Sequence, residues 1–297
     1  MNLNSNFYLI EKPKSWTSQD LCTKFKKTYK FKKVGHSGTL DPNAEGLMLV
    51  ATNSFTKLFD YIGNTNKTYY VKALLGYTSE TLDVDSDYKK VENIKAEEHK
   101  EDIEAYLNNL VGDSLQTPPI YSAIKVNGKR LYKYARQNVE VDIPNRKITV
   151  FNTNLLSLDN ETVEFDITVS KGTYIRSIVS DMGEYLNTKA IVGELIRTAV
   201  GDLKSTNTNK ITNLDNLKSS DKVSPLSWSE VLDLPSIVLD SSKENYIRNG
   251  QLLENRYFKT SNKHLIIIDN QLKAVYEPFN EKYFKPDKVI VWMYTIA

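Results

Sequence analysis

One short loop holds the residue types best able to support chemistry. It reads Gly35-His36-Ser37-Gly38-Thr39-Leu40-Asp41-Pro42 and is followed, after Gly46, by the apolar run Leu47 to Val50. Two glycines in so short a span indicate a backbone that passes close to another group. Asp41 and His36 are its candidate functional side chains. A simpler interpretation is structural, because an aspartate before proline commonly starts a turn by bonding its own backbone.

A second candidate segment reads Ser170-Lys171-Gly172-Thr173-Tyr174-Ile175-Arg176. Apolar residues with helical spacing follow it directly, namely Ile175, Ile178, Val179, Met182 and Leu186. This spacing predicts a helix that begins at the loop. Taken alone, the segment is also compatible with an ordinary strand-to-helix turn in which Arg176 is a surface cation.

Several chemistries are disfavoured by what the sequence lacks. It contains no G-x-G-x-x-G loop, no G-x-x-x-x-G-K-[ST] loop and no H-E-x-x-H pair. One cysteine, Cys22, and three histidines are too few soft ligands for a zinc site. We therefore expect neither a nucleotide cofactor nor a metal. No stretch of eighteen apolar residues and no signal-peptide pattern occurs, which predicts a cytoplasmic protein without a membrane partner.

Basic residues are concentrated in one early segment, although the net charge of the 297 residues is only +2. This lysine patch consists of Lys24, Lys26, Lys27, Lys30, Lys32 and Lys33. Leu21, Phe25 and Tyr29 are spaced four apart within it, which predicts an amphipathic helix with Ser18 as a candidate N-cap. The patch is thus either a phosphate-binding surface or a solvated helix face over a core stripe.

The remaining pattern alternates helices and strands. A helix is expected from Asn53 or Ser54 through Ile62, and another that carries Ile103 and Leu107 and stops near Gly112. Strands are expected at Tyr69 to Leu75, Tyr121 to Val126, Ile148 to Leu156 and Thr162 to Val169, with turns at Asn127-Gly128 and Asp159-Asn160. Residues 205–222 read as a polar connector, and residues from about 235 as a small β-rich module.

Together, these motifs resemble those of the TruB pseudouridine synthases. The two loops match the pair that frames that family's active site. The likeness begins with Glu11-Lys12-Pro13 and Trp16-Thr17-Ser18, and it covers about the first two hundred residues in order. It continues through Lys67-Thr68-Tyr69-Tyr70-Val71, Tyr121-Ser122-Ala123-Ile124-Lys125, Leu131-Tyr132-Lys133-Tyr134-Ala135-Arg136 and Leu195-Ile196-Arg197-Thr198-Ala199-Val200-Gly201.

The resemblance implies roles for individual residues. Asp41 matches the essential carboxylate, which assists exchange of the glycosidic bond from N1 to C5 of uracil by attacking or stabilising C1′ or by removing a proton. Arg176 matches the arginine that pairs with it. Tyr69 matches the tyrosine that stacks on the flipped base, and Tyr174 a second pocket tyrosine. For Tyr69, plain core packing is the alternative.

Further substrate-binding positions are implied in the same way. His36 matches a histidine that fills the T loop or assists base flipping, and Leu195 an apolar pocket wall, for which core packing is again an alternative. Lys12 matches the lysine of the opening motif, with a supporting role near the pocket. One departure is Ser79-Glu80-Thr81, where the family usually has T-D-T, and it puts only a surface or stem contact in doubt.

The implied fold is α+β. It has a mixed, largely antiparallel sheet with flanking helices and a central RNA-binding cleft, plus the small β-rich C-terminal module. Residues 1–234 would form the catalytic domain, with 121–147 as an RNA-clamping loop, and 235–297 a PUA-like RNA-binding domain. The lysine patch would bind phosphates of the tRNA T stem-loop without reading sequence.

The function implied is isomerisation of uridine 55 in the T loop of tRNA. We expect a monomer without cofactor or guide RNA. One alternative is a tRNA-binding or tRNA-folding protein without catalysis, which would need stacking groups and lysines but no carboxylate facing the base. Another is a synthase that works with a guide RNA, since it would share the catalytic motifs. Sister families that modify ribosomal RNA typically have R-L-D where this chain has Thr39-Leu40-Asp41.

Overall fold

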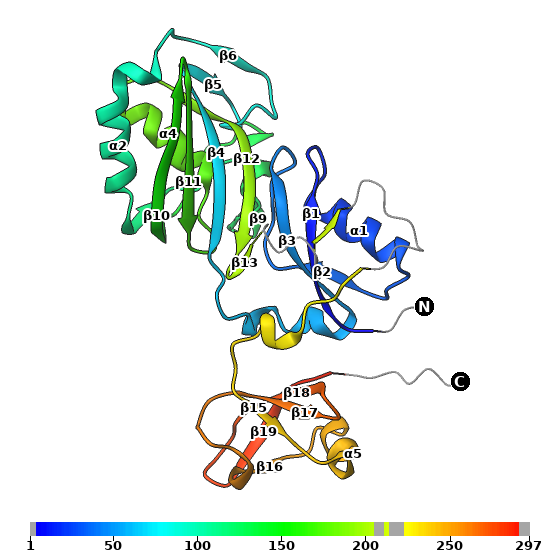
Figure 1. The fold of residues 1–297 in the computed structure, drawn as a ribbon. Coiled ribbons are helices and arrows are strands. Elements are labelled where there is room, and N and C mark those ends of the chain that lie inside the picture. Colours follow the sequence, from blue (N-terminus) through cyan, green and yellow to red (C-terminus); the bar gives the residue numbers. More distant parts are fainter. Residues whose placement is uncertain (1–3, 205–210, 214–222, 291–297) are drawn as a thin grey trace.

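The computed structural model describes residues 4–204, 211–213 and 223–290. The expected connector, 205–222, therefore lies outside the described residues except for the backbone of one short strand. A ten-stranded mixed sheet forms the body (Figure 1). In spatial order it contains β14 (Ile211–Asn213), β1 (Phe7–Lys12), β3 (Glu45–Thr52), β12 (Ala190–Val200), β4 (Lys67–Leu75), β11 (Thr162–Val169), β10 (Arg146–Asp159) and β7 (Gly112–Gln116), with β2 (Val34–His36) beside β3 and β13 (Leu203–Lys204) beside β12.

The sheet has a seam between its two halves. Strand β12 pairs with β4 from Ala190 to Val200, but with β3 only at Ile196↔Glu45 and Arg197↔Gly46. Beyond that short contact β3 and β12 separate (Figure 1). Pairs β1/β14 and β3/β12 are parallel, and the other pairs of this sheet are antiparallel. The α+β class and the mixed, largely antiparallel sheet are thus confirmed.

Three helices cover one face of the sheet: α1 (Ser18–Thr28), α2 (Lys100–Asn109) and α4 (Ile175–Tyr185). They share one hydrophobic cluster with the strands, in which Phe25 of α1, Leu107 of α2 and Val179 of α4 are almost fully buried. The strand residues that face them alternate along the chain, as Val71 and Ala73 do on β4. This cluster fixes the first turn of α4 against the sheet.

The opposite face of β1 and β3 belongs to a second hydrophobic cluster, which also contains residues between Phe55 and Tyr61 and one face of the C-terminal module. That module is a five-stranded sheet of β15 (Ser236–Val238), β17 (His264–Ile268), β18 (Gln271–Pro278), β19 (Tyr283–Val289) and β16 (Leu253–Glu254), with the short helix α5 (Glu244–Arg248). On β17, Leu265 and Ile267 face the body, while Ile266 and Ile268 face the module's own core. The expected β-rich C-terminal module is confirmed (Figure 1).

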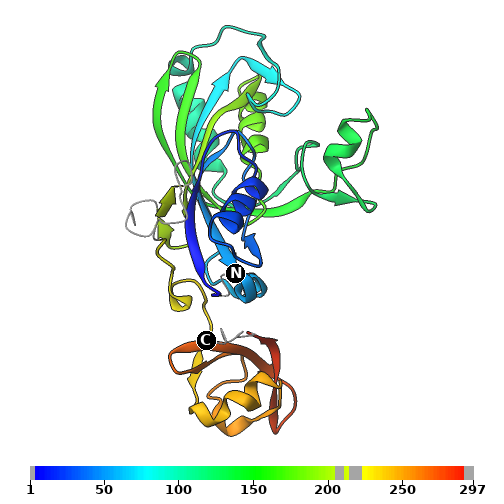
Figure 2. The ribbon, with the colours of Figure 1, turned by 90° about the vertical axis from the view of Figure 1, so that its right-hand side faces the viewer.

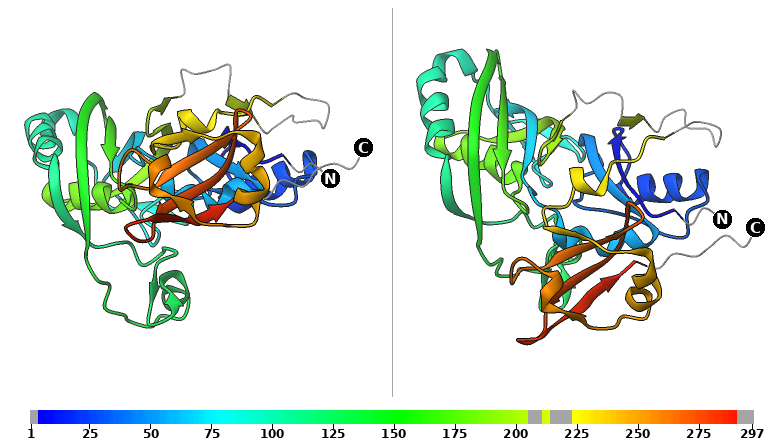
Figure 3. Two further views of the ribbon diagram at one scale, coloured as in Figure 1. Left: turned by 90° about the horizontal axis from the view of Figure 1, so that it is seen from below. Right: turned by 60° about the horizontal axis from the view of Figure 1, so that its bottom comes forward.

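Short elements complete the chain. They are the hairpins β5 (Tyr77–Ser79)/β6 (Tyr88–Lys90) and β8 (Lys125–Val126)/β9 (Lys129–Arg130), helix α3 (Leu131–Ala135), and the 3-10 helices η1 (Asn53–Lys57), η2 (Phe59–Tyr61), η3 (Ala96–His99), η5 (Trp228–Glu230), η6 (Ser241–Lys243) and η7 (Asn255–Tyr257). The segment with α3 and the β8/β9 hairpin extends away from the body (Figures 2 and 3). The longest described helices have 11 residues, too few to cross a bilayer.

Most expected elements are present, with three corrections. Thr17, and not Ser18, caps α1, through a reciprocal bond pair with Asp20. The helix expected from Asn53 is instead the pair η1 and η2, because the Asn53 amide oxygen accepts from the backbone of Lys32 and Lys33 and so does not cap a helix.

The strand expected at Tyr121 to Val126 is reduced to Lys125–Val126. Its first residues bond elsewhere: the Tyr121 carbonyl accepts from Arg176, and the Ser122 carbonyl from the Tyr132 amide. The predicted turn after it is correct, since Asn127 and Gly128 both have positive φ and close the β8/β9 hairpin.

Close packing of α4 on β12 gives a test of this fold. A Cβ on Gly183 would lie 2.5 Å from the backbone nitrogen of Ala190 and 2.7 Å from the carbonyl carbon of Lys189. We expect Gly183→Ala to destabilise the protein by about 1–3 kcal/mol, despite the better helix propensity of alanine, because overpacking against backbone cannot relax. The melting temperature should fall by roughly 2–10 °C. Glu184→Ala, exposed on the same helix, is the control and should leave it nearly unchanged.

Candidate active site

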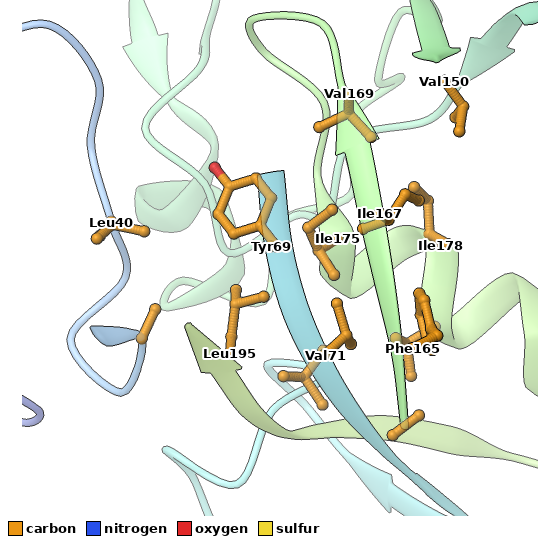
Figure 4. Close-up of a cluster of buried hydrophobic side chains, with 14 of the residues drawn as sticks. Leu40, Tyr69, Val71, Val150, Phe165, Ile167, Val169, Ile175, Ile178 and Leu195 are labelled. Atoms are coloured by element: carbon orange, nitrogen blue, oxygen red, sulfur yellow. The ribbon is translucent and has the colours of Figure 1, made fainter. Parts of the chain in front are cut away.

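The two candidate loops meet in one pocket at the seam of the sheet. Its cavity of about 280 Å³ is lined by residues 38–41 of the first loop, residues 171–176 of the second, Lys67 and Tyr69 of β4, Ser122 and Ala123, and Leu195 of β12. Leu40, Tyr69, Ile175 and Leu195 lie together at this end of the hydrophobic cluster (Figure 4). Segments more than one hundred residues apart in the chain thus share a single site.

Asp41 and Arg176 form an ion pair at the base of the pocket. Arg176 Nε lies 2.8 Å from Asp41 Oδ2. The other two nitrogens of the guanidinium donate to backbone carbonyls, Nη1 to Thr81 at 2.9 Å and Nη2 to Tyr121 at 3.0 Å. The arginine side chain is only 6% exposed, whereas the aspartate side chain is 39% exposed. A fixed, buried cation therefore orients a carboxylate that still reaches the open pocket.

The backbone on both sides of Asp41 is held by the opening segment of the chain. The Ser18 hydroxyl donates to the Leu40 carbonyl at 3.0 Å and accepts from the Leu40 amide at 2.8 Å. The Lys12 ammonium donates to the Pro42 carbonyl at 3.0 Å and to two further backbone carbonyls nearby. These contacts fix the loop before and after the aspartate. They give the Lys12 and Ser18 positions of the opening motif a physical purpose.

The expectation that Lys12 binds substrate needs correction. Its side chain is fully buried and all its hydrogen bonds go to backbone carbonyls. Burial lowers the pKa of the ammonium to about 8, although Glu45 and Asp41 act against that shift. Lys12 is thus a positioning residue behind the loop, because a fully buried ammonium cannot touch a molecule in the pocket.

The walls of the pocket are apolar and aromatic. Tyr69 and Leu195 line it and are 7% and 6% exposed. Tyr174 lines it from the second loop, and burial raises the pKa of its phenol. The backbone of Tyr174 is fixed by Gln116 of β7, whose amide accepts from the Tyr174 N–H at 2.8 Å and donates to its carbonyl at 3.0 Å. The pocket therefore presents rigid aromatic surface next to a carboxylate.

Two sets of predicted residues lie outside this lining. His36 ends β2. Its side chain is half-buried, and the buried Nδ1 atom has no hydrogen-bond partner within the described part of the chain. Burial lowers the pKa of its imidazole, so the neutral ring is favoured. The six lysines of the lysine patch are all exposed on α1 and the residues after it. They form a surface and not a part of the pocket.

Sequence reasoning missed a buried carboxylate behind the ion pair. Asp83 is 2% exposed, and its Oδ1 accepts from the Asn43 side chain at 2.8 Å and from the Asp85 amide at 3.1 Å. Burial raises its pKa to about 6, while the positive charge of Arg176 acts in the opposite direction. Ser79-Glu80-Thr81, the segment that departs from the family's T-D-T pattern, also supports the site, because the Thr81 carbonyl accepts a hydrogen bond from Arg176.

Comparison with known proteins agrees with this geometry. Residues 26–175 match the description "TruB family pseudouridylate synthase (N terminal domain)". The chain belongs to the TruB family. It is therefore related to pseudouridine synthases, which are isomerases, and the resemblance inferred from the motifs is confirmed.

Similar proteins cover nearly the whole chain. A tRNA pseudouridine synthase B of Oceanobacillus iheyensis is 34% identical over 94% of this chain and 95% of its own. One of Bacillus subtilis is 35% identical over 95% of this chain and 96% of its own. Among solved structures, a chain of a Cbf5-Nop10-Gar1 complex superposes with a TM-score of 0.69 at 22% identity, over 97% of this chain and 85% of that one. This last likeness supports the fold alone.

Arg176→Lys tests the orientation of the carboxylate in this TruB-family site. A lysine has no planar fork and cannot reach Asp41 and two carbonyls at once, so we expect kcat for pseudouridine formation to fall about 10- to 100-fold. Binding of the RNA should change far less, because the Arg176 side chain is buried and its three nitrogens are already paired within the protein. Single-turnover rates and dissociation constants measure the two effects. Equal losses in both would argue against a positioning role.

Asp83→Asn tests the buried carboxylate through its pH dependence. Folding raises the pKa of Asp83 from its unfolded value, near 4, to about 6. The protein therefore loses stability as the pH rises through this range, because the carboxyl group ionises more readily in the unfolded chain. At pH 7.5 the ionised Asp83 should therefore cost roughly 2–3 kcal/mol that an asparagine would not.

We expect the variant to melt at a higher temperature than wild type at pH 7.5 and at a similar temperature at pH 4. Thermal melts of both proteins across this range give the comparison. A variant less stable at pH 7.5 would mean that the Arg176 charge outweighs burial at Asp83.

Proposed function

We propose that this protein isomerises uridine 55 in the T loop of tRNA to pseudouridine, with Asp41 as the catalytic carboxylate. The observation that carries the proposal is the half-exposed Asp41 carboxylate, oriented by Arg176 and facing an aromatic pocket. Relatives that match over almost their full length are named tRNA pseudouridine synthase B. A protein that only binds tRNA would have no use for a carboxylate held at this point.

The reaction breaks the bond from C1′ of the ribose to N1 of uracil and forms one from C1′ to C5. The C5 proton is then lost and N1 gains one, so no cofactor is needed and the atoms of the nucleotide are conserved. Asp41 acts on the electron-poor C1′, by attack or by electrostatic stabilisation, or it removes a proton. The Arg176 guanidinium lies 2.8 Å from Asp41 Oδ2 and so fixes the orientation of the carboxylate for any of these roles.

The base must leave the RNA stack to reach Asp41. Its π-face would stack on Tyr69, with Leu195 and Tyr174 as the remaining walls, and a stacked base gains about 1–3 kcal/mol. The cavity of about 280 Å³ is of a size for one nucleotide and not for a duplex. His36, outside the lining, is assigned to the T loop around the flipped base and not to the chemistry.

Recognition of the RNA body is assigned to three surfaces. The lysine patch would bind T-arm phosphates, and its six exposed cations support this. Residues 121–147 extend from the body beside the pocket, as an RNA clamp would (Figure 2). Residues 235–297 are assigned as a PUA-like RNA-binding domain that follows a catalytic domain of residues 1–234.

We further propose a monomer that acts without guide RNA, since the full-length relatives bear the name of a tRNA enzyme.

The decisive test is tritium release from a tRNA transcript labelled at uridine C5. Wild-type protein should release tritium from position 55, and Asp41→Asn should lower the rate by at least about 10³-fold, because an amide is neither a nucleophile nor a base. Asp60→Asn changes an exposed aspartate on η2 and is the matched control, expected to react like wild type. Tight tRNA binding by wild type without any release would replace the synthase with a tRNA-binding protein.

A further inference from the structure

Lys67 and Arg197 form a second group of charges at the pocket, which has different partners from the Asp41–Arg176 pair and which the reaction above does not use. Lys67 lines the pocket, is 6% exposed, and donates to the Thr65 carbonyl. Arg197 of β12 is 2% exposed, and its Nε donates to the Leu47 carbonyl at 2.6 Å and its Nη2 to the Gly38 carbonyl at 3.3 Å. Its Nη1 is buried and has no hydrogen-bond partner in the described chain.

Among the described residues, neither cation has a counter-ion. No carboxylate of the described residues forms an ion pair with Lys67 or Arg197. The charged neighbours that act on Lys67 are themselves cations, Arg197 and Lys171, and together with burial they lower the pKa of its ammonium to about 8. Buried charges in native proteins are normally paired, because unpaired ones lose hydration without compensation. Two buried cations without an ion-pair partner, placed beside an open pocket, therefore favour the binding of an anion there.

Gly38 lies between the two cations and the open pocket. A Cβ on Gly38 would lie 3.2 Å from Lys67 Cε and 3.7 Å from Arg197 Nη1. The missing side chain leaves room directly over both cations, at a residue that also lines the pocket. Gly38 has no positive φ that would require glycine, so space and not backbone conformation is the reason for a glycine here. A methyl group at this position would cover the two charges.

We propose that Lys67 and Arg197 form a subsite for one backbone phosphate that flanks the nucleotide in the pocket. The inference rests on the proposed function and adds to it a contact outside the lysine patch. Lys67 makes the direct contact from the pocket wall. Arg197 is a positioning residue that supports the anion's charge from below and holds the Gly38 carbonyl.

The spacing along β4 favours a phosphodiester over other anions. Lys67 and Tyr69 are two residues apart on the same face of the strand, so their backbones are about 6.6 Å apart. A base stacked on Tyr69 and a ribose at Asp41 leave the adjoining phosphate as the next group along the strand. Lys171, exposed at the rim, adds charge on the same side. A detached uracil anion would instead stay over Tyr69, and the experiment below distinguishes the two.

The test combines Lys67→Met with neutral backbone groups in the RNA. Methionine keeps the buried apolar stem and removes the charge. Three synthetic T stem-loops are compared: one with a methylphosphonate 5′ of the target uridine, one with a methylphosphonate 3′ of it, and one with a natural backbone. Dissociation constants, KM and kcat are measured for each protein with each RNA. Lys72→Met is the matched control, because Lys72 lies on the same strand but on its opposite face, paired with Glu164.

We expect Lys67→Met to weaken binding and raise KM about 10- to 100-fold, with kcat within about threefold of wild type. One of the two methylphosphonates should weaken RNA binding by wild type by the same factor, and should hardly change binding by Lys67→Met. The two losses are non-additive because both changes remove the same contact. Lys72→Met should show the full methylphosphonate loss. Without RNA, Lys67→Met should melt at or above the wild-type temperature, because one of two like charges is gone.

Other outcomes overturn the subsite. Additive losses at both positions would mean that Lys67 contacts neither flanking phosphate. A fall in kcat with unchanged KM would assign Lys67 to the detached uracil instead. If wild type releases no tritium, the proposed function fails, yet the dissociation constants still decide the phosphate contact by themselves.

Discussion

The Arg176 guanidinium is the interaction on which the site depends. Its three nitrogens bind Asp41, the Thr81 carbonyl and the Tyr121 carbonyl, three groups brought together from distant parts of the chain. A planar fork satisfies three fixed acceptors at once, and its charge pairs with the carboxylate in a site that RNA would dehydrate. Because Arg176 lies in the first turn of α4, the packing of that helix on the sheet sets where the carboxylate points.

Local patterns were sufficient to predict most elements. The alternating residues of β4 and the helical spacing after Tyr174 specify burial on one face, so their structure follows from short-range sequence alone. The segment after Tyr121 was predicted wrongly because its backbone bonds to Arg176 and to the following helix. No local pattern reports such partners. The N-cap error at Ser18 has the same origin, since the Ser18 hydroxyl is occupied by Leu40.

The same distinction applies to the site. Asp41 and Arg176 stand in motifs, so they were identifiable before the structure, and the ion pair expected between them is present. Lys67 and Arg197 stand in matched segments as well, but no role followed for them from the sequence. Only burial distinguishes these two residues and Asp83 from ordinary charged residues. Burial depends on which strands meet at the seam between β3 and β12, and that is a tertiary property. Lys12 illustrates the converse, because its motif position suggested contact with substrate, yet its ammonium is enclosed by carbonyls.

The two charged parts of the pocket differ in how far they are compensated. At one, Asp41 already has its cation, so entry of a neutral ribose and base changes little in the charge balance there. At the other, Lys67 and Arg197 repel each other until an anion arrives. A nucleotide has this polarity, with an uncharged sugar and base joined to a charged phosphate. The free energy lost by leaving the cations unpaired is recovered on binding, which favours RNA that enters in the one orientation that brings its ribose to Asp41.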